Sequence, residues 1–304
     1  MAKARIAVIG AGLMGHGIAQ VFALAGHDVT IYDSVQASLD TAKARILTNL
    51  KDLGDDQSVV ERVTPVGDLA QAVRAADYVV EAVLEDLPLK QKIFGEIEKH
   101  VRPDTILASN TSVIPITSIM QGLQKRERAL GTHWWNPPYL VPLVEVIETQ
   151  WTSSEAVAWT IRLHQAAGKE PAHVKKDVPG FIGNRLQHAL WREAVALVEQ
   201  GICDAETVDS VIKAAFGRRL AVLGPLENAD MVGTDLTLAI HKTVLPDIDS
   251  RPHPSPYLEK LVRDGKLGFK SGEGFRKWSP EQQAALRSKV LQHLKKAREQ
   301  DLKQ

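Results

Sequence analysis

A histidine and a glutamate, His133 and Glu145, have the types and surroundings expected of an acid–base pair. Glu145 lies in the apolar run Val141–Ile147, where an unpaired carboxylate would be costly to bury. A histidine twelve residues earlier can supply a cationic partner, and imidazole exchanges its proton near neutral pH. Oxidation of an alcohol needs such a base beside a hydride acceptor. The alternative is a structural histidine, since His133 is one of ten in the chain, and these two residues do not by themselves decide between the interpretations.

A glycine-rich loop near the N-terminus has the pattern of a dinucleotide site. The loop Gly10-Ala11-Gly12-Leu13-Met14-Gly15 follows an apolar strand and opens a helical segment. In this pattern the first glycine permits a tight turn, the second admits a pyrophosphate, and the third lets helix and strand pack closely. Asp33 ends the next predicted strand and can accept hydrogen bonds from an adenosine ribose. Because a carboxylate there repels a 2′-phosphate, the sequence predicts NAD rather than NADP; the alternatives are a flavin or a structural turn.

The first half of the chain has the alternating pattern that would hold these residues in place. Short β-branched runs predict strands over Arg5–Ile9, Asp28–Tyr32, Val63–Val66, Asp77–Val83, Thr105–Ala108, Ala129–His133 and Leu143–Ile147. Helices are predicted between and after them, over Leu13–Ala25, Ser38–Leu53, Leu87–His100 and Ser154–Ala167. The strands lack in/out alternation, which is typical of parallel strands covered on both faces.

Helical patterns take over after about residue 177. The breaker Asp177–Gly180 is followed by predicted helices over Phe181–Gln200, Ala205–Phe216, Leu226–Leu245 and Ser255–Arg263, and by one more after Ser279. The four prolines of Leu245–Pro256 predict a surface loop. We therefore predict an α/β protein with a Rossmann-type, doubly wound, mostly parallel sheet over residues 1–178. An all-α domain is predicted over residues 179–304.

Composition narrows the class of protein. A chain of 304 residues is long enough for two domains. Its 37 basic and 37 acidic residues balance, which argues against attraction to nucleic acid or an acidic membrane. No apolar run reaches the roughly 18–20 residues of a membrane span, and the single Cys203 fits a reducing compartment. We expect a cytoplasmic protein that binds neither nucleic acid, membrane nor metal.

Five further motifs follow one another along the chain: Ser109-Asn110-Thr111-Ser112, Gly131-Thr132-His133-Trp134-Trp135-Asn136-Pro137, Leu143–Ile147, Gly180-Phe181-Ile182-Gly183-Asn184-Arg185 and Gly272-Glu273-Gly274-Phe275. Together they resemble the 3-hydroxyacyl-CoA dehydrogenase family over about residues 4–278. The resemblance implies a Rossmann-type domain and a helical C-terminal domain that forms a homodimer. It also implies reversible, NAD-dependent oxidation of a 3-hydroxyacyl-CoA, of short chain, to the 3-ketoacyl-CoA.

The resemblance further implies residue roles. It makes His133 and Glu145 a catalytic dyad, and it places Ser112 and Asn184 beside the oxygens of the substrate. Asn184 lies in a helical stretch, where asparagine is a poor helix former, and this independently favours a specific hydrogen bond. The cofactor contacts that the resemblance implies come from Glu85, Lys90, Asn110, Asn136 and Lys270.

Three features depart from the family pattern. The segment Leu39–Glu61 lacks the lysine-rich stretch that typically meets CoA phosphates, and a Trp-Trp pair at 134–135 replaces Phe-Phe. The third departure is the segment Gly217–Glu227. This segment and the Trp-Trp pair resemble the L-gulonate and carnitine dehydrogenase branches, which act on free hydroxy acids. Arg218 and Arg219 are either a fork for a substrate carboxylate or surface charges. A free-acid dehydrogenase therefore stays an alternative, and an NAD-binding structural protein without turnover is a third.

Overall fold

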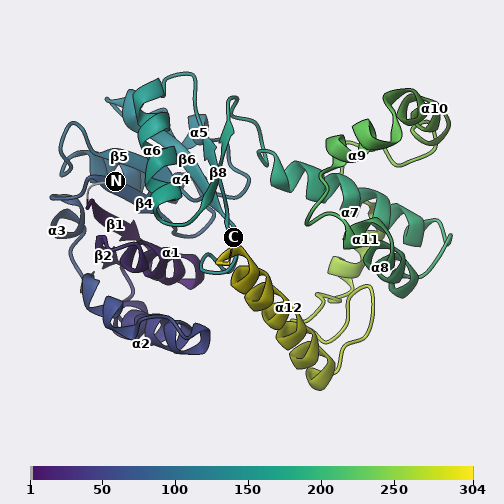
Figure 1. Cartoon of the computed structure of the whole chain (residues 1–304), viewed down its shortest axis with the longest axis horizontal. Helices are drawn as coiled ribbons and strands as arrows, with labels where there is room; N and C mark the ends of the chain where they lie inside the picture. The colour runs from purple at the N-terminus through teal and green to yellow at the C-terminus, as the bar shows by residue number, and fades with distance from the viewer. Residues whose placement is uncertain (1–2, 304) are drawn as a thin grey trace. The chain divides into compact units, whose positions relative to one another are not determined.

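The computed structural model describes residues 3–303 and contains one eight-stranded sheet (Figure 1). Its strand order is β3-β2-β1-β4-β5-β6-β7-β8. The strands are β1 Arg5–Ile9, β2 Asp28–Tyr32, β3 Val63–Val66, β4 Tyr78–Glu81, β5 Ile106–Ser109, β6 Ala129–Trp134, β7 Leu143–Ile147 and β8 Glu170–Val174. Neighbours from β3 to β6 are parallel, β7 is antiparallel to β6, and β8 is parallel to β7. The predicted doubly wound, mostly parallel sheet is confirmed.

Helices cover both faces of this sheet. Six α-helices and two 3-10 turns are interleaved with its strands: α1 Leu13–Leu24, α2 Gln36–Leu53, η1 Gln57–Arg62, α3 Leu69–Val73, α4 Leu87–Glu98, α5 Ile116–Met120, η2 Arg126–Arg128 and α6 Ser154–Ala166. Local signals set several of their ends. The side chains of Asp86 and Ser153 accept amide hydrogen bonds at the starts of α4 and α6, and Gly54 ends α2 with φ +71°.

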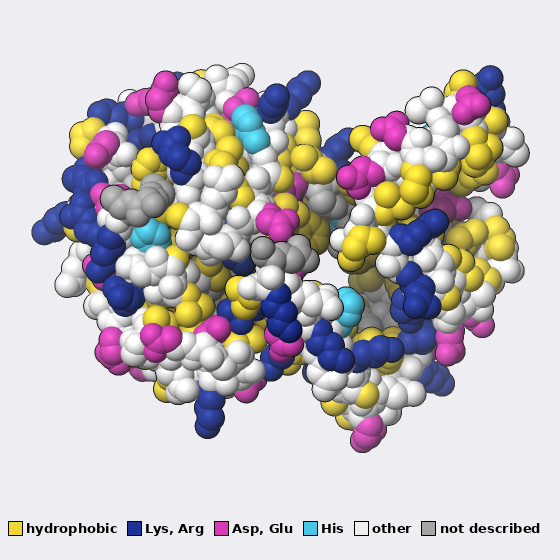
Figure 2. Space-filling model, in the orientation of Figure 1, with side chains coloured by type: hydrophobic (Ala, Val, Ile, Leu, Met, Phe, Trp, Pro, Cys, Tyr) yellow, Lys and Arg dark blue, Asp and Glu magenta, His cyan; other side chains and the backbone are white. Residues whose placement is uncertain are grey.

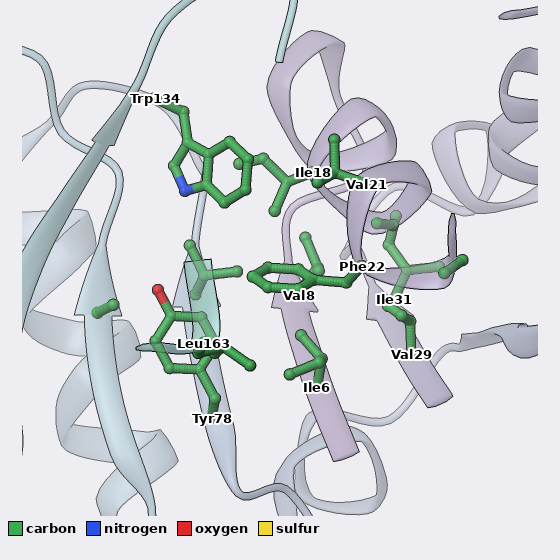
Figure 3. Packing of buried hydrophobic residues seen from close by; sticks show 14 of the residues in the cluster. Ile6, Val8, Ile18, Val21, Phe22, Val29, Ile31, Tyr78, Trp134 and Leu163 are labelled. Carbon is green, nitrogen blue, oxygen red and sulfur yellow. The ribbon is translucent and has the colours of Figure 1, made fainter. Parts of the chain in front are cut away.

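The core is divided by the sheet into two layers. Ile6 and Val8 of β1 belong to one buried cluster, whereas Ala7 and Ile9 belong to the other. Figure 3 shows the first cluster, in which the ring of Phe22 from α1 lies among strand residues. β1 therefore has apolar side chains on both of its faces. Strands buried on both faces in this way have continuous apolar sequences.

The helical second half forms its own unit. Its helices are α7 Gly183–Glu199, α8 Ala205–Ala214, η3 Phe216–Arg218, α9 Pro225–Val232, α10 Thr234–Val244 and α11 Pro256–Arg263, and α12 Pro280–Asp301 follows. The single helix predicted over Leu226–Leu245 is wrong, because Gly233 has φ +101° and separates α9 from α10. Exposed apolar side chains gather on this unit, and many appear yellow on its face in Figure 2.

Residue contacts divide the chain into Met1–Arg185 with Gln292–Gln304, and Leu186–Leu291. The end of α12 is thus grouped with the sheet. Lys295 donates to the carbonyl of Asp52 at 3.1 Å, and Arg298 binds both carboxylate oxygens of Asp55 at 2.8 and 3.0 Å. Among the described residues, no helix has the length and apolar character needed to cross a membrane.

Candidate active site

The register of two antiparallel strands brings His133 and Glu145 together. They are direct cross-strand partners in β6 and β7. Nδ1 of His133 lies 2.7 Å from Oε2 of Glu145, and the two residues are only 3% and 1% exposed. The rings of Trp135 and Phe181 lie 5.2 and 5.6 Å from the imidazole, measured between centroids. The histidine is therefore held in one orientation, with Nδ1 on the carboxylate.

The second oxygen of Glu145 holds the start of α7. Oε1 accepts the amide of Ile182 at 2.8 Å and that of Gly183 at 3.0 Å. Burial acts to raise the pKa of Glu145, but the hydrogen bonds from His133 and these amides outweigh it and keep the pKa below its usual value. Glu145 is therefore ionised at neutral pH. Nδ1 of His133 donates to it, which leaves Nε2 to accept a proton.

The same helix start brings Asn184 to Ser112. Nδ2 of the buried Asn184 donates to the carbonyl of Ser112 at 2.8 Å. The amide of Ser112 donates to Oε1 of Glu85 at 2.9 Å, while Ser112 itself stays exposed. Gly183 binds Glu145, and Asn184, the next residue of α7, binds Ser112. The first turn of α7 therefore connects the His133–Glu145 pair with the Ser112–Asn184 pair.

A buried group of charges supports the Ser109–Ser112 segment. Nζ of Lys90 lies 2.7 Å from Oε1 of Glu81 and 3.4 Å from Oε2 of Glu85, and both Lys90 and Glu81 are almost inaccessible. Oε2 of Glu81 accepts the hydroxyl of Ser109 at 2.6 Å. Sequence reasoning missed Glu81, although a carboxylate in the apolar strand β4 is the same signal that marks Glu145.

The glycine loop has the backbone that its motif predicts. Gly10 has φ +105°, and a Cβ there would lie 2.6 Å from the carbonyl oxygen of Ala82. A Cβ on Gly15 would lie 1.7 Å from the carbonyl oxygen of Gly10, so β1 and α1 could not pack as they do. A Cβ on Gly12 would meet nothing within 4 Å among the described residues apart from its chain neighbours. This face of the loop is open, and the unpaired amides of a helix start suit a phosphate there.

Asp33 is hydrogen-bonded to the glycine loop. Its Oδ2 accepts the amide of Ala11 at 2.7 Å, and its Oδ1 accepts the amide of Val35 at 2.9 Å. Each carboxylate oxygen has a second lone pair, which can accept a ribose hydroxyl. The loop and Asp33 therefore fit the pyrophosphate and the adenosine ribose of NAD.

The remaining predicted site residues differ in burial: one is buried and the others lie at the surface. Oδ1 of the buried Asn110 accepts the amide of Trp134 at 2.9 Å, and the exposed Asn136 follows β6. Within the helical unit, the structure places three predicted basic residues at the surface: Arg218, Arg219 and Lys270. In the described part of the chain, no group of three or more His, Cys, Asp or Glu side chains is arranged to hold a metal ion.

Several relatives are similar to this chain over most of its length. The 5-formyl-3-hydroxy-2-methylpyridine 4-carboxylate 5-dehydrogenase of Mesorhizobium japonicum is 37% identical over 95% of each chain. A solved structure of an enzyme of that name, described as an NAD⁺-dependent dismutase, covers 99% of both chains with a TM-score of 0.91 and 36% identity. Human mitochondrial hydroxyacyl-coenzyme A dehydrogenase is 38% identical over 90% of each chain. The structure of (S)-3-hydroxybutyryl-CoA dehydrogenase from Ralstonia eutropha covers 91% of this chain and 100% of that one, with a TM-score of 0.77 and 32% identity.

Family models also cover nearly the whole chain. Residues 5–178 match the NAD binding domain of 3-hydroxyacyl-CoA dehydrogenase. Residues 180–278 match the C-terminal domain of the same enzyme. The chain therefore belongs to the 3-hydroxyacyl-CoA dehydrogenase family, whose members are NAD-dependent oxidoreductases that act on CH–OH groups.

Proposed function

We propose that this protein oxidises the 3-hydroxyl of a short 3-hydroxyacyl-CoA to a 3-keto group, and catalyses the reverse reduction, with His133 and Glu145 as a dyad. The observation that carries the proposal is the buried contact of 2.7 Å between His133 Nδ1 and Glu145 Oε2. It leaves Nε2 as the free basic nitrogen of the ring. The family relationship and the 3-hydroxybutyryl-CoA dehydrogenases among the relatives support the substrate class.

In this mechanism, His133 takes the proton of the substrate hydroxyl at Nε2 and becomes an imidazolium. Glu145 stabilises that charge from the Nδ1 side. Bound NAD supplies the acceptor for the hydride that leaves C3 of the substrate. Ser112 and Asn184, joined through the 2.8 Å hydrogen bond, orient the substrate oxygens. In the reverse direction His133 returns its proton to the oxygen.

The cofactor proposal extends to individual residues. The glycine loop would hold the pyrophosphate, and Asp33 would bind the adenosine ribose, as their geometry fits. We assign further cofactor contacts to the polar side chains of Glu85, Asn110, Asn136 and Lys270. Lys90, which the resemblance also implies, is almost inaccessible and is paired with Glu81 and Glu85, so we propose that it acts indirectly, by holding the Ser109–Ser112 segment in place.

A free carboxylate is the second candidate substrate. It is favoured by the likeness to the pyridine 4-carboxylate dehydrogenase, which extends over 99% of both chains. The last turn of α2 carries one lysine, Lys51, and Asp55 just beyond the helix is paired with Arg298, so this segment offers no lysine cluster for CoA phosphates. Arg218 and Arg219 are the basic residues that we propose for the carboxylate in that case.

One assay distinguishes the two substrates. NADH consumption is followed with acetoacetyl-CoA and, separately, with free 3-keto acids and an aromatic aldehyde carboxylate. A kcat/KM for acetoacetyl-CoA at least about a hundredfold above the free compounds (about 2.7 kcal/mol of transition-state binding) supports the first candidate. The opposite ratio supports the second. Tight NADH binding with turnover of none of them would contradict both and indicate a structural NAD-binding protein.

We also propose that the helical unit forms a homodimer, as the family resemblance implies. Large apolar side chains on α9 and α10 are 44–80% exposed in the single chain, namely Leu226, Met231, Val232, Leu236, Leu238, Ile240 and Val244. An apolar surface of this kind on a water-soluble protein is typical of an interface.

A further inference from the structure

Arg45, which lies in α2 outside the glycine motif, binds the glycine loop from behind. Its Nη2 donates to the carbonyl of Ala11 at 2.6 Å and to the carbonyl of Ser38 at 2.9 Å. Its Nη1 lies 3.4 Å from the carbonyl of Gly12. One half-buried guanidinium therefore joins two successive loop carbonyls to the first turn of α2.

These contacts determine which way the loop amides face. In a trans peptide the C=O and N–H groups point in opposite directions. Arg45 takes the carbonyl of the Ala11–Gly12 peptide and approaches that of the Gly12–Leu13 peptide. The amides of Gly12 and Leu13 must then point away from Arg45. The loop also leaves free space at this point, since a Cβ on Gly12 would meet no other part of the described chain within 4 Å.

The neighbouring His16 completes the arrangement without adding a charge. Its Nδ1 lies 2.7 Å from the carbonyl of Gly12 and 3.3 Å from Nη1 of Arg45. Burial lowers the pKa of His16, and the charge of Arg45 acts in the same direction. With His16 neutral, Nδ1 can carry the hydrogen that the Gly12 carbonyl accepts. Arg45 then supplies the positive charge of this Arg45–His16 pair behind the loop.

We propose that Arg45 is a positioning residue for the pyrophosphate of NAD. It fixes the rear carbonyls of the loop, so the amides of Gly12 and Leu13 are turned towards the phosphates before the cofactor arrives. It also places one positive charge behind them, in line with the partial positive charge at the start of α1. This role does not depend on which alcohol the enzyme oxidises.

The test compares Arg45→Met with Lys43→Met by calorimetry and by displacement of NADH. Lys43 lies in the same helix and forms an exposed ion pair with Glu61, so its substitution removes the same charge without touching the loop. The probes are ADP-ribose, which contains the pyrophosphate, and adenosine, which does not. We expect Arg45→Met to weaken ADP-ribose at least about tenfold (about 1.4 kcal/mol). Adenosine should bind as to the wild type, and Lys43→Met should leave both affinities unchanged.

Two results would overturn the proposal: an unchanged affinity for ADP-ribose in Arg45→Met, or an equal loss for adenosine and ADP-ribose. Arg45→Lys provides a second measurement if Arg45→Met does not fold. Lysine keeps the charge but lacks the planar fork that reaches several carbonyls. An intermediate loss for ADP-ribose supports positioning, whereas wild-type affinity in Arg45→Lys would assign the effect to charge alone.

Discussion

At the scale of single residues, the two carboxylate oxygens of Glu145 bind three partners in two different elements. One oxygen binds Nδ1 of His133, and the other binds two amides at the start of α7. Glu145→Gln can still accept from the amides through its carbonyl, but its NH₂ group then faces Nδ1 and favours the wrong tautomer. We expect kcat to fall by about 10²–10⁴, the range for a lost acid–base group. Steady-state kinetics measures kcat, with whichever of acetoacetyl-CoA and the free acids the wild type turns over faster.

The two members of the dyad should act as one unit. The double variant His133→Ala/Glu145→Gln is expected to be scarcely slower than the slower single variant, because groups that act together are not additive. The affinity of these variants for NADH should stay within about twofold of wild type. A larger change would require the loss of a contact that binds the cofactor itself. Normal turnover in His133→Ala would remove this residue from the mechanism, and loss of fold in that variant would make it a structural histidine.

The pKa of Glu145 gives a prediction about stability and pH. Because the folded protein lowers this pKa from its usual 4.5, the ionised form stabilises the fold above that pH. The stabilisation disappears as pH falls through the lowered pKa. The difference in unfolding free energy between wild type and Glu145→Gln should therefore be largest near pH 6 and shrink towards pH 3. Urea titrations at several pH values measure it; a difference that grows on acidification would contradict the ionised carboxylate.

Asp33 carries the cofactor prediction at this scale. Asp33→Ala removes the proposed ribose acceptor and the acceptor of the hydrogen bond from the Ala11 amide. We expect NAD binding to weaken by about 1–3 kcal/mol, as for a lost charged acceptor. Discrimination against NADP should shrink in parallel, and calorimetry with both cofactors measures this. A wild-type enzyme that already prefers NADP would show that the ribose argument is wrong.

Of the partners of Glu145, the sequence predicts the histidine but not the two backbone amides. A carboxylate in an apolar strand needs a partner, so His133 can be predicted from composition and spacing. The amides of Ile182 and Gly183 cannot, because they come from a helix start 37 and 38 residues later, and only the folded chain brings them near. The same limit applies to Arg45, whose partners in the glycine loop lie 33 and 34 residues earlier.

At the scale of elements, Gly183 lets α7 begin against the dyad. A Cβ on Gly183 would lie 2.5 Å from Cζ2 of Trp135, whereas a Cβ on Gly95, inside α4, would meet nothing within 4 Å. Gly183→Ala should destabilise the fold by about 1–3 kcal/mol through overpacking and lower kcat as well. Gly95→Ala should be neutral or stabilise by up to about 1 kcal/mol. Urea unfolding of both variants is the measurement, and equal effects would contradict the close contact.

Strand and helix positions were largely predictable because most βαβ elements have strong apolar patterns. β8 at Glu170–Val174 was missed, since its sequence Glu-Pro-Ala-His-Val contains a proline and polar residues and forms the edge of the sheet. The break between α9 and α10 was missed too. A glycine inside an apolar helical pattern is tolerated in many helices, and only the positive φ of Gly233 shows that it ends one here.

At the scale of the whole molecule, the proposed homodimer has a direct test. Sedimentation at micromolar concentration should give about twice the mass of the 33.4 kDa chain. Leu226→Glu, at a side chain 80% exposed in the single chain, should shift the protein towards monomer because it puts a charge into an apolar interface. Leu302→Glu, at a side chain 72% exposed and outside the helical unit, is the matched control. A wild-type monomer would overturn the proposal.

The grouping of the last turns of α12 with the sheet has a consequence for biosynthesis. Lys295 and Arg298 bind Asp52 and Asp55, residues more than two hundred positions earlier. A ribosome adds these basic residues only after the whole helical unit has been translated. The nascent Rossmann-type unit must therefore wait, with the carboxylate of Asp55 unpaired and hydrated, until translation has passed residue 298. Stalling the ribosome before that point should yield a unit that exchanges its α2 amide hydrogens faster than the released protein does.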